Sequence, residues 1–345
     1  MTKISVKLLK WYDKHQRILP WRAKDGSVVN PYHVWLSEIM LQQTTVAAVQ
    51  SYFKKFLTRW PTIEALASAP EEDVLAAWAG LGYYARARNL IKCAKIIAYE
   101  NGGTFPSEEA ALRKLPGIGD YTAAAMAAIA FGHSAVVVDA NIERIVTRLM
   151  KIKTPLPAAK KDIKAATALI TPSDRAGDFA QAMMDLGSSI CKPKAPKCND
   201  CPLKADCGAC ANASMESYPV KAAKKIRPTR RALAYFVEVD GYILLERRPD
   251  KGLLGGMPGL LCNAWVEQTV EKAFDHSILP PPFKANWCLV DGISKHTFTH
   301  FHLETKVMQA KLDTRPQSNH LWVKREDALN FGLPTVFKKM LKLAL

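Results

Sequence analysis

The sequence lacks any run that approaches the ~20 consecutive apolar residues a membrane-spanning helix needs. Its N-terminal stretch, MTKISVKLLKWYDKHQR, also has no apolar core long enough for a secretory signal peptide, so we expect a soluble, cytoplasmic protein. Acidic residues are few beside basic ones, 32 against 48 in 345 residues, which gives a formal net charge of +16. This excess favours an acidic partner, of which nucleic acid is the commonest, although a solvated basic surface would give the same balance.

Two domains are expected from the change of pattern along the chain. Residues 1–211 carry apolar residues near helical spacing between glycine and proline breaks, which predicts an all-α domain. Residues 212–229 are polar, basic and poorly patterned, and we interpret them as a linker. Residues 230–345 contain strand-like runs and a helical tail, which predicts a smaller α/β domain.

Three local signals organise the expected second domain. The runs ALAYFVEV and YILLERR are joined by Asp240-Gly241, a dipeptide typical of a two-residue hairpin turn. Residues 296–305 alternate with a period of two and predict one strand. A helix is expected from Pro334 onward.

Five of the eight cysteines lie between residues 191 and 210. Because disulfides would be unusual in a large chain without an export signal, this clustering indicates a metal site. A spacing of C-x6-C-x2-C-x5-C joins Cys191, Cys198, Cys201 and Cys207. Four thiolates can hold either zinc or an iron–sulfur cube, but zinc modules more often show two C-x2-C pairs, and we count one. Cys210 falls outside the spacing and is interpreted as a bystander.

A glycine-bracketed turn, LPGIGDYTA, separates two helical patterns at residues 115–123. With no side chains on Gly117 and Gly119, a DNA backbone could approach the N–H groups that begin the next helix. An ordinary helix–helix connection is the alternative.

Glu38 and Asp139 are candidates for a pair of carboxyl groups with different protonation states. Glu38 has apolar neighbours, and burial among them would raise its pKa and keep it protonated. Asp139 begins a predicted helix, whose dipole favours the ionised form. Cleavage of a glycosidic bond uses such a neutral acid and such an anion. The alternatives are a surface glutamate and a simple helix cap.

Several segments resemble, in chain order, those of the MutY family of adenine DNA glycosylases, in the helix-hairpin-helix superfamily that includes endonuclease III. They are NPYHVWLSEIMLQQTTV, GLGYYARARNL, LPGIGDYTA, VVVDANIERIV and FAQAMMDLG. The resemblance implies a base excision repair enzyme that removes adenine paired with 8-oxoguanine or guanine in double-stranded DNA, and acts as a monomer. It implies Glu38 as the general acid and Asp139 as the stabiliser of an oxocarbenium-like sugar, supported by Tyr121 and Asn141.

Tyr121 stands where strand-cutting relatives carry a Schiff-base lysine. A phenol cannot form an imine, so we expect base removal without strand cleavage through this residue. By the same match, the adenine pocket is expected to be formed by Trp21, Arg22, Leu41, Val46 and Gln181. Gln43 and Tyr83 match wedge residues that fill the gap left by an extruded base.

The cysteine spacing matches the [4Fe–4S] loop of endonuclease III and of the MutY family, so the resemblance implies one [4Fe–4S] cluster. We assign it a structural and DNA-docking role, because base removal needs no electron transfer. The expected fold is therefore multidomain, with an all-α helix-hairpin-helix glycosylase domain carrying the cluster loop, followed by an α/β Nudix-like domain.

The C-terminal residues resemble the Nudix-like domain of the same family in the segments GLLGGMPGL and HTFTHFHL. The magnesium-binding box of Nudix hydrolases is missing after Gly259, where LLCNAWVEQTVEKAFDHS stands, so we expect no pyrophosphatase activity. The resemblance implies that Phe298, Thr299 and His300 read 8-oxoguanine, with threonine in place of the serine of the family.

Two other interpretations stay open. One is an endonuclease III-like enzyme for oxidised pyrimidines with lyase activity, which Tyr121 and the C-terminal domain disfavour. The other is a non-catalytic iron–sulfur protein that binds DNA or carries electrons, which would make the pairing of Glu38 and Asp139 a coincidence.

Overall fold

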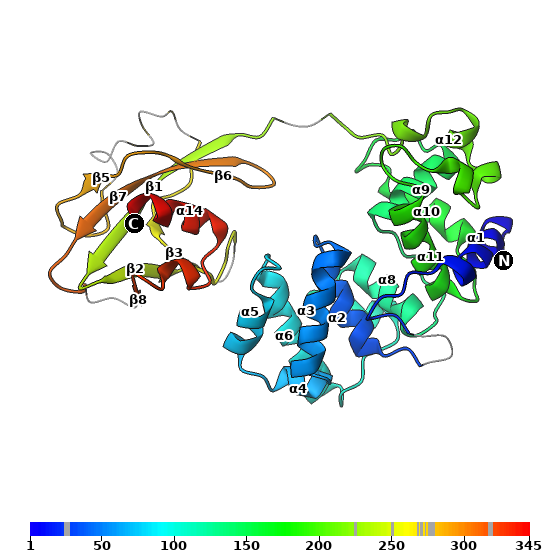
Figure 1. Ribbon diagram of the computed structural model, residues 1–345, viewed down its shortest axis with the longest axis horizontal. Coiled ribbons are helices and arrows are strands. Elements are labelled where there is room, and N and C mark those ends of the chain that lie inside the picture. The colour runs from blue at the N-terminus through cyan, green and yellow to red at the C-terminus, as the bar shows by residue number, and fades with distance from the viewer. Residues whose placement is uncertain are drawn as a thin grey trace. The chain divides into compact units, whose positions relative to one another are not determined.

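The computed structural model describes residues 1–23, 28–223, 226–249, 252–267, 269, 272, 274, 280–316 and 320–345. Two compact units, Met1–Ala223 and Lys224–Leu345, make up the chain (Figure 1). Most of the segment expected as a linker is counted in the first unit, where Lys221 forms a bridge with Leu156. Residues 224–225 of that segment lie outside the described part. Among the described residues, no helix has the length and apolar character needed to cross a membrane.

The first unit is helical, in agreement with the sequence pattern. Its elements are α1 (Lys3–His15), α2 (Pro31–Leu41), α3 (Val46–Arg59), α4 (Ile63–Ala67), α5 (Glu71–Trp78), α6 (Ala85–Lys95), the π-helical turn η1 (Ile96–Glu100), α7 (Glu109–Leu112), α8 (Asp120–Ile129), α9 (Ala140–Met150), α10 (Lys160–Ile170), α11 (Ala176–Ser189), η2 (Cys198–Asp200), η3 (Lys204–Asp206), α12 (Gly208–Ala211) and η4 (Met215–Ser217). Its core contains large side chains with no exposed surface, including Trp35, Phe53 and Trp78.

Helix α8 lies at the centre of the first unit and packs against α2 and α11. Its alanine-rich sequence suits this position, because small side chains let the neighbouring helices approach closely. Gly177 of α11 shows how close they come: a Cβ there would lie 2.5 Å from the carbonyl oxygen of Ala128. Helix α9 also packs against α11, so the ends of α2, α8, α9 and α11 meet in one region.

The connection from α7 to α8 is the tight turn expected from LPGIGDYTA. Leu115 and Ile118 are buried, whereas Gly117 and Gly119 are exposed. Gly117 has φ of +80°, a conformation that favours glycine, and Gly119 is the N-cap of α8.

The second unit contains a mixed sheet in its described residues. The elements are β1 (Thr229–Val239), β2 (Tyr242–Arg247), β3 (Pro258–Gly259), β4 (Leu261–Cys262), β5 (Cys288–Leu289), β6 (Ser294–Thr297), β7 (His302–Lys311), β8 (Leu321–Lys324), η5 (Ala328–Asn330) and α14 (Thr335–Ala344). Strands β1 and β7 pair in parallel at its centre, and the order β3-β2-β1-β7-β5 runs through them. Helix α14 packs on the sheet through Val336, Phe337 and Met340 (Figure 1).

Two of the local predictions in this unit are confirmed and one is wrong. Asp240-Gly241 joins β1 to β2, and both residues have positive φ, as a primed hairpin turn requires. The helix expected from Pro334 is α14, with Pro334 as its N-cap. The single strand expected at 296–305 is instead a hairpin of β6 and β7, with Thr297 opposite His302.

The prediction of one strand was wrong because the period-two alternation of residues 296–305 continues through the hairpin turn. Phe298 and Phe301 both pack inward, with ring centroids 4.8 Å apart, and the Phe298 N–H donates to the Phe301 carbonyl (2.9 Å). Two apolar residues at a turn therefore imitate the pattern of a strand. The stretch that replaces the Nudix box lies partly outside the described residues, at 268, 270–271, 273 and 275–277.

Candidate active site

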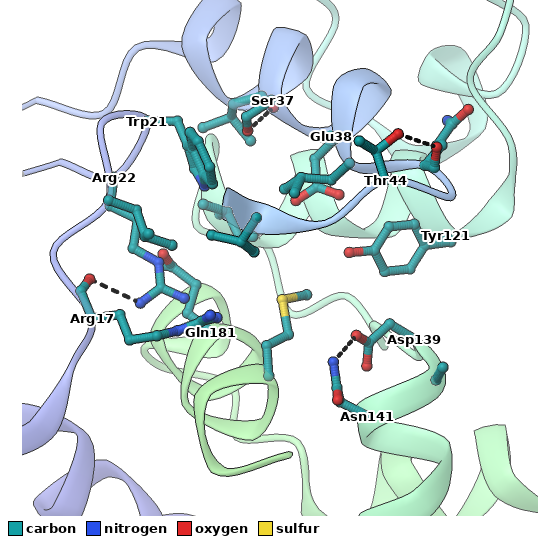
Figure 2. Close-up of a pocket in the computed structure, with 18 of the residues that line it drawn as sticks. Arg17, Trp21, Arg22, Ser37, Glu38, Thr44, Tyr121, Asp139, Asn141 and Gln181 are labelled. Carbon is teal, nitrogen blue, oxygen red and sulfur yellow. Dashed lines mark hydrogen bonds between the residues drawn. The ribbon is translucent and has the colours of Figure 1, made fainter. Parts of the chain in front are cut away.

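A cavity of about 380 Å³ opens where helices α2, α8, α9 and α11 meet (Figure 2). Its lining brings together ten residues singled out from the sequence: Trp21, Arg22, Glu38, Leu41, Gln43, Val46, Tyr121, Asp139, Asn141 and Gln181. In Figure 2, Glu38 and Tyr121 face the cavity from one side, and Asp139 and Asn141 face it from another. A cavity of this volume can hold a small planar ligand.

Glu38 occupies the last part of α2, a helix that is apolar almost all round. Its side chain is 6% exposed, and Oε2 has no hydrogen-bond partner among the described residues. Burial raises the pKa of Glu38 to about 7; Tyr121 lowers it by hydrogen bonding, whereas the charge of Asp139 raises it. The environment therefore favours the protonated carboxyl group near neutral pH, as the apolar neighbours in the sequence predict.

Asp139 is the N-cap of α9, and every contact of its carboxylate is with a donor. Oδ1 accepts from the Ile142 N–H (2.7 Å), and Oδ2 accepts from Asn141 Nδ2 (2.8 Å). The carboxylate thus lies at the start of a helix with a donor to each of its oxygens. The two carboxyl groups of the cavity therefore have different surroundings, one apolar and one hydrogen-bonded.

Arg144 fixes Asn141 behind Asp139. Its Nη2 donates to Asn141 Oδ1 (2.9 Å) and to the Gly187 carbonyl (2.7 Å), and its Nε donates to the Cys191 carbonyl (2.7 Å). Gly187 is required by space, because a Cβ there would lie 2.5 Å from the Cβ of Asn141. The cavity and the start of the cysteine loop therefore share one hydrogen-bonded arginine.

Asp185 is a functional candidate that sequence reasoning missed. It is 1% exposed and accepts from Arg22 Nη1 and Nη2 at 2.7 and 2.8 Å, and from the Arg17 N–H at 3.0 Å. Arg17 Nε adds a second ion pair to the same carboxylate. The paired hydrogen bonds to Asp185 hold the guanidinium of Arg22 at the cavity wall. Gln181, one turn before Asp185 on α11, lines the same cavity (Figure 2). The clue in the sequence was an aspartate among apolar residues in FAQAMMDLG.

The rest of the expected adenine pocket is apolar. Trp21 is buried with its ring edge-on to Phe53, at 5.4 Å between centroids. Leu41 and Val46 are half-buried at the end of α2 and the start of α3. Apolar walls with one guanidinium and one amide suit an aromatic base with polar edges.

Gln43 and Tyr83 occupy two exposed turns with left-handed backbone, φ +59° and +48°. Gln43 lies at the cavity, while Tyr83 is outside the lining and 59% exposed. Tyr83 is therefore not part of the core. Non-glycine residues in this conformation cost about 1–3 kcal/mol each and tend to occur at functional sites.

Gly119 is not explained by the fold. Its backbone is extended, at φ −94° and ψ −177°, and a Cβ there would meet nothing within 4 Å. The chain itself would therefore accept a side chain at this position. Open space in front of a helix N-terminus suits close approach of an external anion, as the sequence pattern predicts for a DNA phosphate.

The cysteine loop follows α11. Cys191, Cys198, Cys201 and Cys207 are all free and half-buried, and their thiols lie near enough to influence one another electrostatically. Within the described ranges, no three or more His, Cys, Asp or Glu groups are close enough to share a metal ion. Four thiolates can hold either a zinc ion, at about 2.3 Å from each sulfur, or an iron–sulfur cube.

Arg148 shapes the loop from within. It is 1% exposed, and its guanidinium donates to Cys191 Sγ (3.3 Å) and to the carbonyls of Lys192 (2.8 Å) and Pro193 (3.0 Å). The guanidinium therefore joins Cys191 to the residues that begin the loop.

Cys210 requires a correction. Cys207 and Cys210 form a second C-x2-C pair in addition to Cys198 and Cys201, so the count of one pair was wrong. The Cys210 thiol also contacts that of Cys198, because α12 turns it back toward the loop. Cys210 is therefore not remote from the expected ligands.

In the second unit, the expected recognition residues occupy the β6–β7 turn. Phe298 is half-buried against His296 and Trp265, at 4.6 and 5.6 Å between ring centroids. Thr299 and His300 are exposed at the tip. An anchored phenylalanine thus presents a hydroxyl and an imidazole to solvent.

Comparisons with known proteins agree with this architecture. Residues 36–172 match the HhH-GPD superfamily of base excision DNA repair proteins, and residues 232–343 match the NUDIX domain. A solved thermostable thymine-DNA glycosylase is similar, with a TM-score of 0.54 and 27% identity, covering 61% of this chain and 95% of that chain. The fold and site are thus those of a helix-hairpin-helix DNA glycosylase with a Nudix-like C-terminal domain.

Two relatives narrow this class. The adenine DNA glycosylase of Homo sapiens is 31% identical and covers 99% of this chain and 74% of its own length. That of Buchnera aphidicola subsp. Acyrthosiphon pisum (strain APS) is 34% identical over 99% of this chain and 98% of its own length. The chain belongs to the adenine DNA glycosylase family, and it is a base excision repair glycosylase, a hydrolase that acts on DNA.

Replacing Asp185 by Asn tests whether the buried fork holds the cavity wall. The change leaves the guanidinium of Arg22 buried without its anion, so we expect the free energy of unfolding to fall by roughly 3–5 kcal/mol. Asp178→Asn on the same helix is the control, since its ion pair with Arg175 is exposed and worth about 1 kcal/mol at most. Urea denaturation followed by circular dichroism measures both, and equal losses would contradict the role of Asp185.

Proposed function

We propose that this protein hydrolyses the N-glycosidic bond of adenine mispaired with 8-oxoguanine or guanine, without cutting the strand. The observation that carries the proposal is the pair in one cavity: a buried Glu38 with a raised pKa and a fully hydrogen-bonded Asp139. A reaction that needs a proton on the leaving base and a negative charge near the sugar requires these two states together.

The reaction begins with protonation of an extruded adenine. The neutral carboxyl of Glu38 donates its proton to N7, which turns the base into a better leaving group. As the C1′–N9 bond breaks, positive charge develops on the sugar, and the carboxylate of Asp139 stabilises it. Water then adds to C1′ and gives its proton to the carboxylate of Glu38, which leaves free adenine and an abasic site.

Neighbouring residues support these two carboxyl groups. Asn141 holds Asp139 in place, and the Tyr121 phenol borders Glu38 without offering an amine for imine formation. Trp21 and Leu41 enclose the base, and Arg22 and Gln181 present donors to its edge. Because a base inside a duplex cannot reach this cavity, extrusion precedes the chemistry, with Gln43 and Tyr83 as wedges and Gly117 and Gly119 at the phosphates.

A single-turnover assay on a duplex with one adenine opposite 8-oxoguanine tests the proposal. We expect strand cleavage only after alkali, because an abasic site remains intact until base is added. Asp139→Asn should lose turnover by about a hundredfold or more, since the stabilising charge is gone, while duplex binding stays close to that of the parent.

Asp120→Asn is the matched control, because that carboxylate is exposed and outside the cavity. Strand cleavage without alkali would show that an amine acts elsewhere in the chain. Absence of base loss in folded, iron-loaded protein would favour the DNA-binding alternative, and full activity of the Asp139 variant would overturn its role.

The pH dependence follows from Glu38. Its carboxyl group must be protonated at the start, so the single-turnover rate should be level below pH 7 and fall by about tenfold per pH unit above it.

The raised pKa of Glu38 also means that the folded state binds this proton more tightly than the unfolded chain. Its contribution to stability is complete below pH 4.5 and disappears by about pH 7. Glu38→Gln should be inactive and should lack this loss of stability; a parent profile that rises above pH 7 would contradict the assignment.

We also propose that Cys191, Cys198, Cys201 and Cys207 hold one [4Fe–4S] cluster. The spacing of the four cysteines in the sequence and the electrostatic influence of their thiols on one another support it. When bound, the cluster supplies covalent cross-links and no chemistry for the glycosidic bond. The loop lysines, among them Lys192, Lys194 and Lys197, would then face DNA phosphates as part of a fixed surface.

Cys198→Ser and Cys210→Ser distinguish ligand from neighbour. We expect Cys198→Ser to lose most of the iron and the broad visible absorption, because the cube loses one of four anchors. Cys210→Ser should keep both, although its thiol contacts Cys198. Iron and zinc are measured by elemental analysis of each purified protein. Iron loss in the Cys210 variant alone, or zinc in the parent, would contradict the ligand set.

For the second unit, we propose recognition of the base opposite adenine by the β6–β7 turn. Thr299 retains the hydroxyl of the family's serine and adds a methyl group, so a hydrogen bond to 8-oxoguanine remains feasible. Phe298 anchors the turn, and His300 lies beside Thr299 at its tip. The enzyme would act as a monomer, with one DNA duplex as its partner.

A further inference from the structure

Arg86 is a buried arginine that the catalytic scheme leaves unused. It is the second residue of α6 and is 9% exposed. Its Nη1 donates to the carbonyls of Ile39 and Met40, at 3.0 Å each. These carbonyls belong to the last turn of α2, directly after Glu38, where a helix has no intrahelical donors left. Arg86 therefore caps the helix that carries the proposed acid.

The other terminal nitrogen of Arg86 reaches both strained turns. Its Nη2 donates to Thr44 Oγ1 (3.2 Å), next to Gln43, and to the carbonyls of Leu81 (2.9 Å) and Gly82 (3.3 Å), next to Tyr83. Figure 2 shows Thr44 in the chain that continues from α2 past Glu38. One guanidinium thus bridges two turns that are forty residues apart in the sequence.

Arg86 also contacts Tyr83 directly. The guanidinium lies 5.7 Å from the centroid of the Tyr83 ring and 5.2 Å from that of Trp78, and the Arg86 N–H donates to the Tyr83 carbonyl (2.8 Å). Left-handed backbone at a non-glycine residue persists when surrounding contacts hold it. These contacts surround Tyr83 from the ring side and from the backbone side.

We propose that Arg86 is a positioning residue for base extrusion, which sets the spacing of the Gln43 and Tyr83 turns and locks both to the end of α2. This inference rests on the proposed function, since it assumes that the two turns enter the duplex. Lysine cannot replace arginine here, because a single ammonium nitrogen cannot span acceptors on α2 and on both turns at once. Loss of the bridge would slow extrusion more than it slows bond cleavage of an extruded base.

The test follows extrusion apart from chemistry. In an Asp139→Asn background, 2-aminopurine replaces the target adenine opposite 8-oxoguanine, and its fluorescence rises when it leaves the base stack. We expect Arg86→Lys to slow this rise by about tenfold or more, because misplaced groups hold the duplex in the wrong geometry. Arg59→Lys is the matched control: that arginine also stacks on a ring, Trp60 at 4.7 Å, but it bridges no turns.

A second substrate separates positioning from a general loss of structure. A mismatch beside the target base weakens stacking and makes extrusion easier. In single-turnover glycosylase assays, with Asp139 intact, the Arg86→Lys defect should therefore shrink on the flanking-mismatch duplex. A merely destabilised protein would lose the same active fraction on both substrates, and that equal loss would overturn the proposal.

Thr44→Val keeps the test decisive if the lysine variant fails to fold. It removes one acceptor of Arg86 and keeps the side-chain shape, so we expect a smaller defect of the same kind. Parental extrusion rates in both variants would refute the bridge. If the parent itself neither extrudes 2-aminopurine nor releases adenine, the proposed function fails, and that outcome is distinct from failure of Arg86 alone.

Discussion

The proposed chemistry asks one cavity to hold a neutral carboxyl group and an ionised carboxylate at the same time, and the surroundings of the two groups differ accordingly. Burial in an apolar helix raises the pKa of Glu38, and its Oε2 has no hydrogen-bond donor among the described residues. A shift from 4.5 to about 7 means that burying its charged form costs ~3 kcal/mol. The carboxylate of Asp139, in contrast, accepts hydrogen bonds from the start of α9 and from the amide of Asn141. Neither environment could serve both groups, so they must come from different elements.

Buried arginines hold together the separate elements that supply these groups. The cavity is built from helix ends and turns distant in sequence, whose carbonyls have no partners of their own. Arg86, Arg144 and Arg148 each reach several such carbonyls, and Arg22 is fixed by Asp185. A planar guanidinium with five donors joins several chain segments where a lysine would join fewer. The site is therefore held by polar contacts around an apolar core.

Local signals in the sequence predicted those features of the site that depend on residues close by in the chain. The apolar residues around Glu38 indicated its burial, and the position of Asp139 before a helical pattern indicated its cap. Groups that act across the fold were not predictable in this way. Asp185 meets Arg22 over 163 positions, and nothing near either residue announces the other. The strand expected at 296–305 failed for a related reason, because inward packing of Phe298 depends on tertiary contacts.

Two glycines of the first unit differ in why the position could require glycine: packing within the chain in one case, and open surface in the other. Gly187 is required by packing, since a side chain there would collide with Asn141 behind the carboxylate of Asp139. Gly119 has ordinary extended backbone and open space in front of it, so the folded chain alone gives no reason for glycine. Gly119 lies in LPGIGDYTA and Gly187 in FAQAMMDLG, and the sequence alone does not distinguish the two reasons. The proposed contact of a DNA phosphate with the start of α8 would supply a reason from outside the chain.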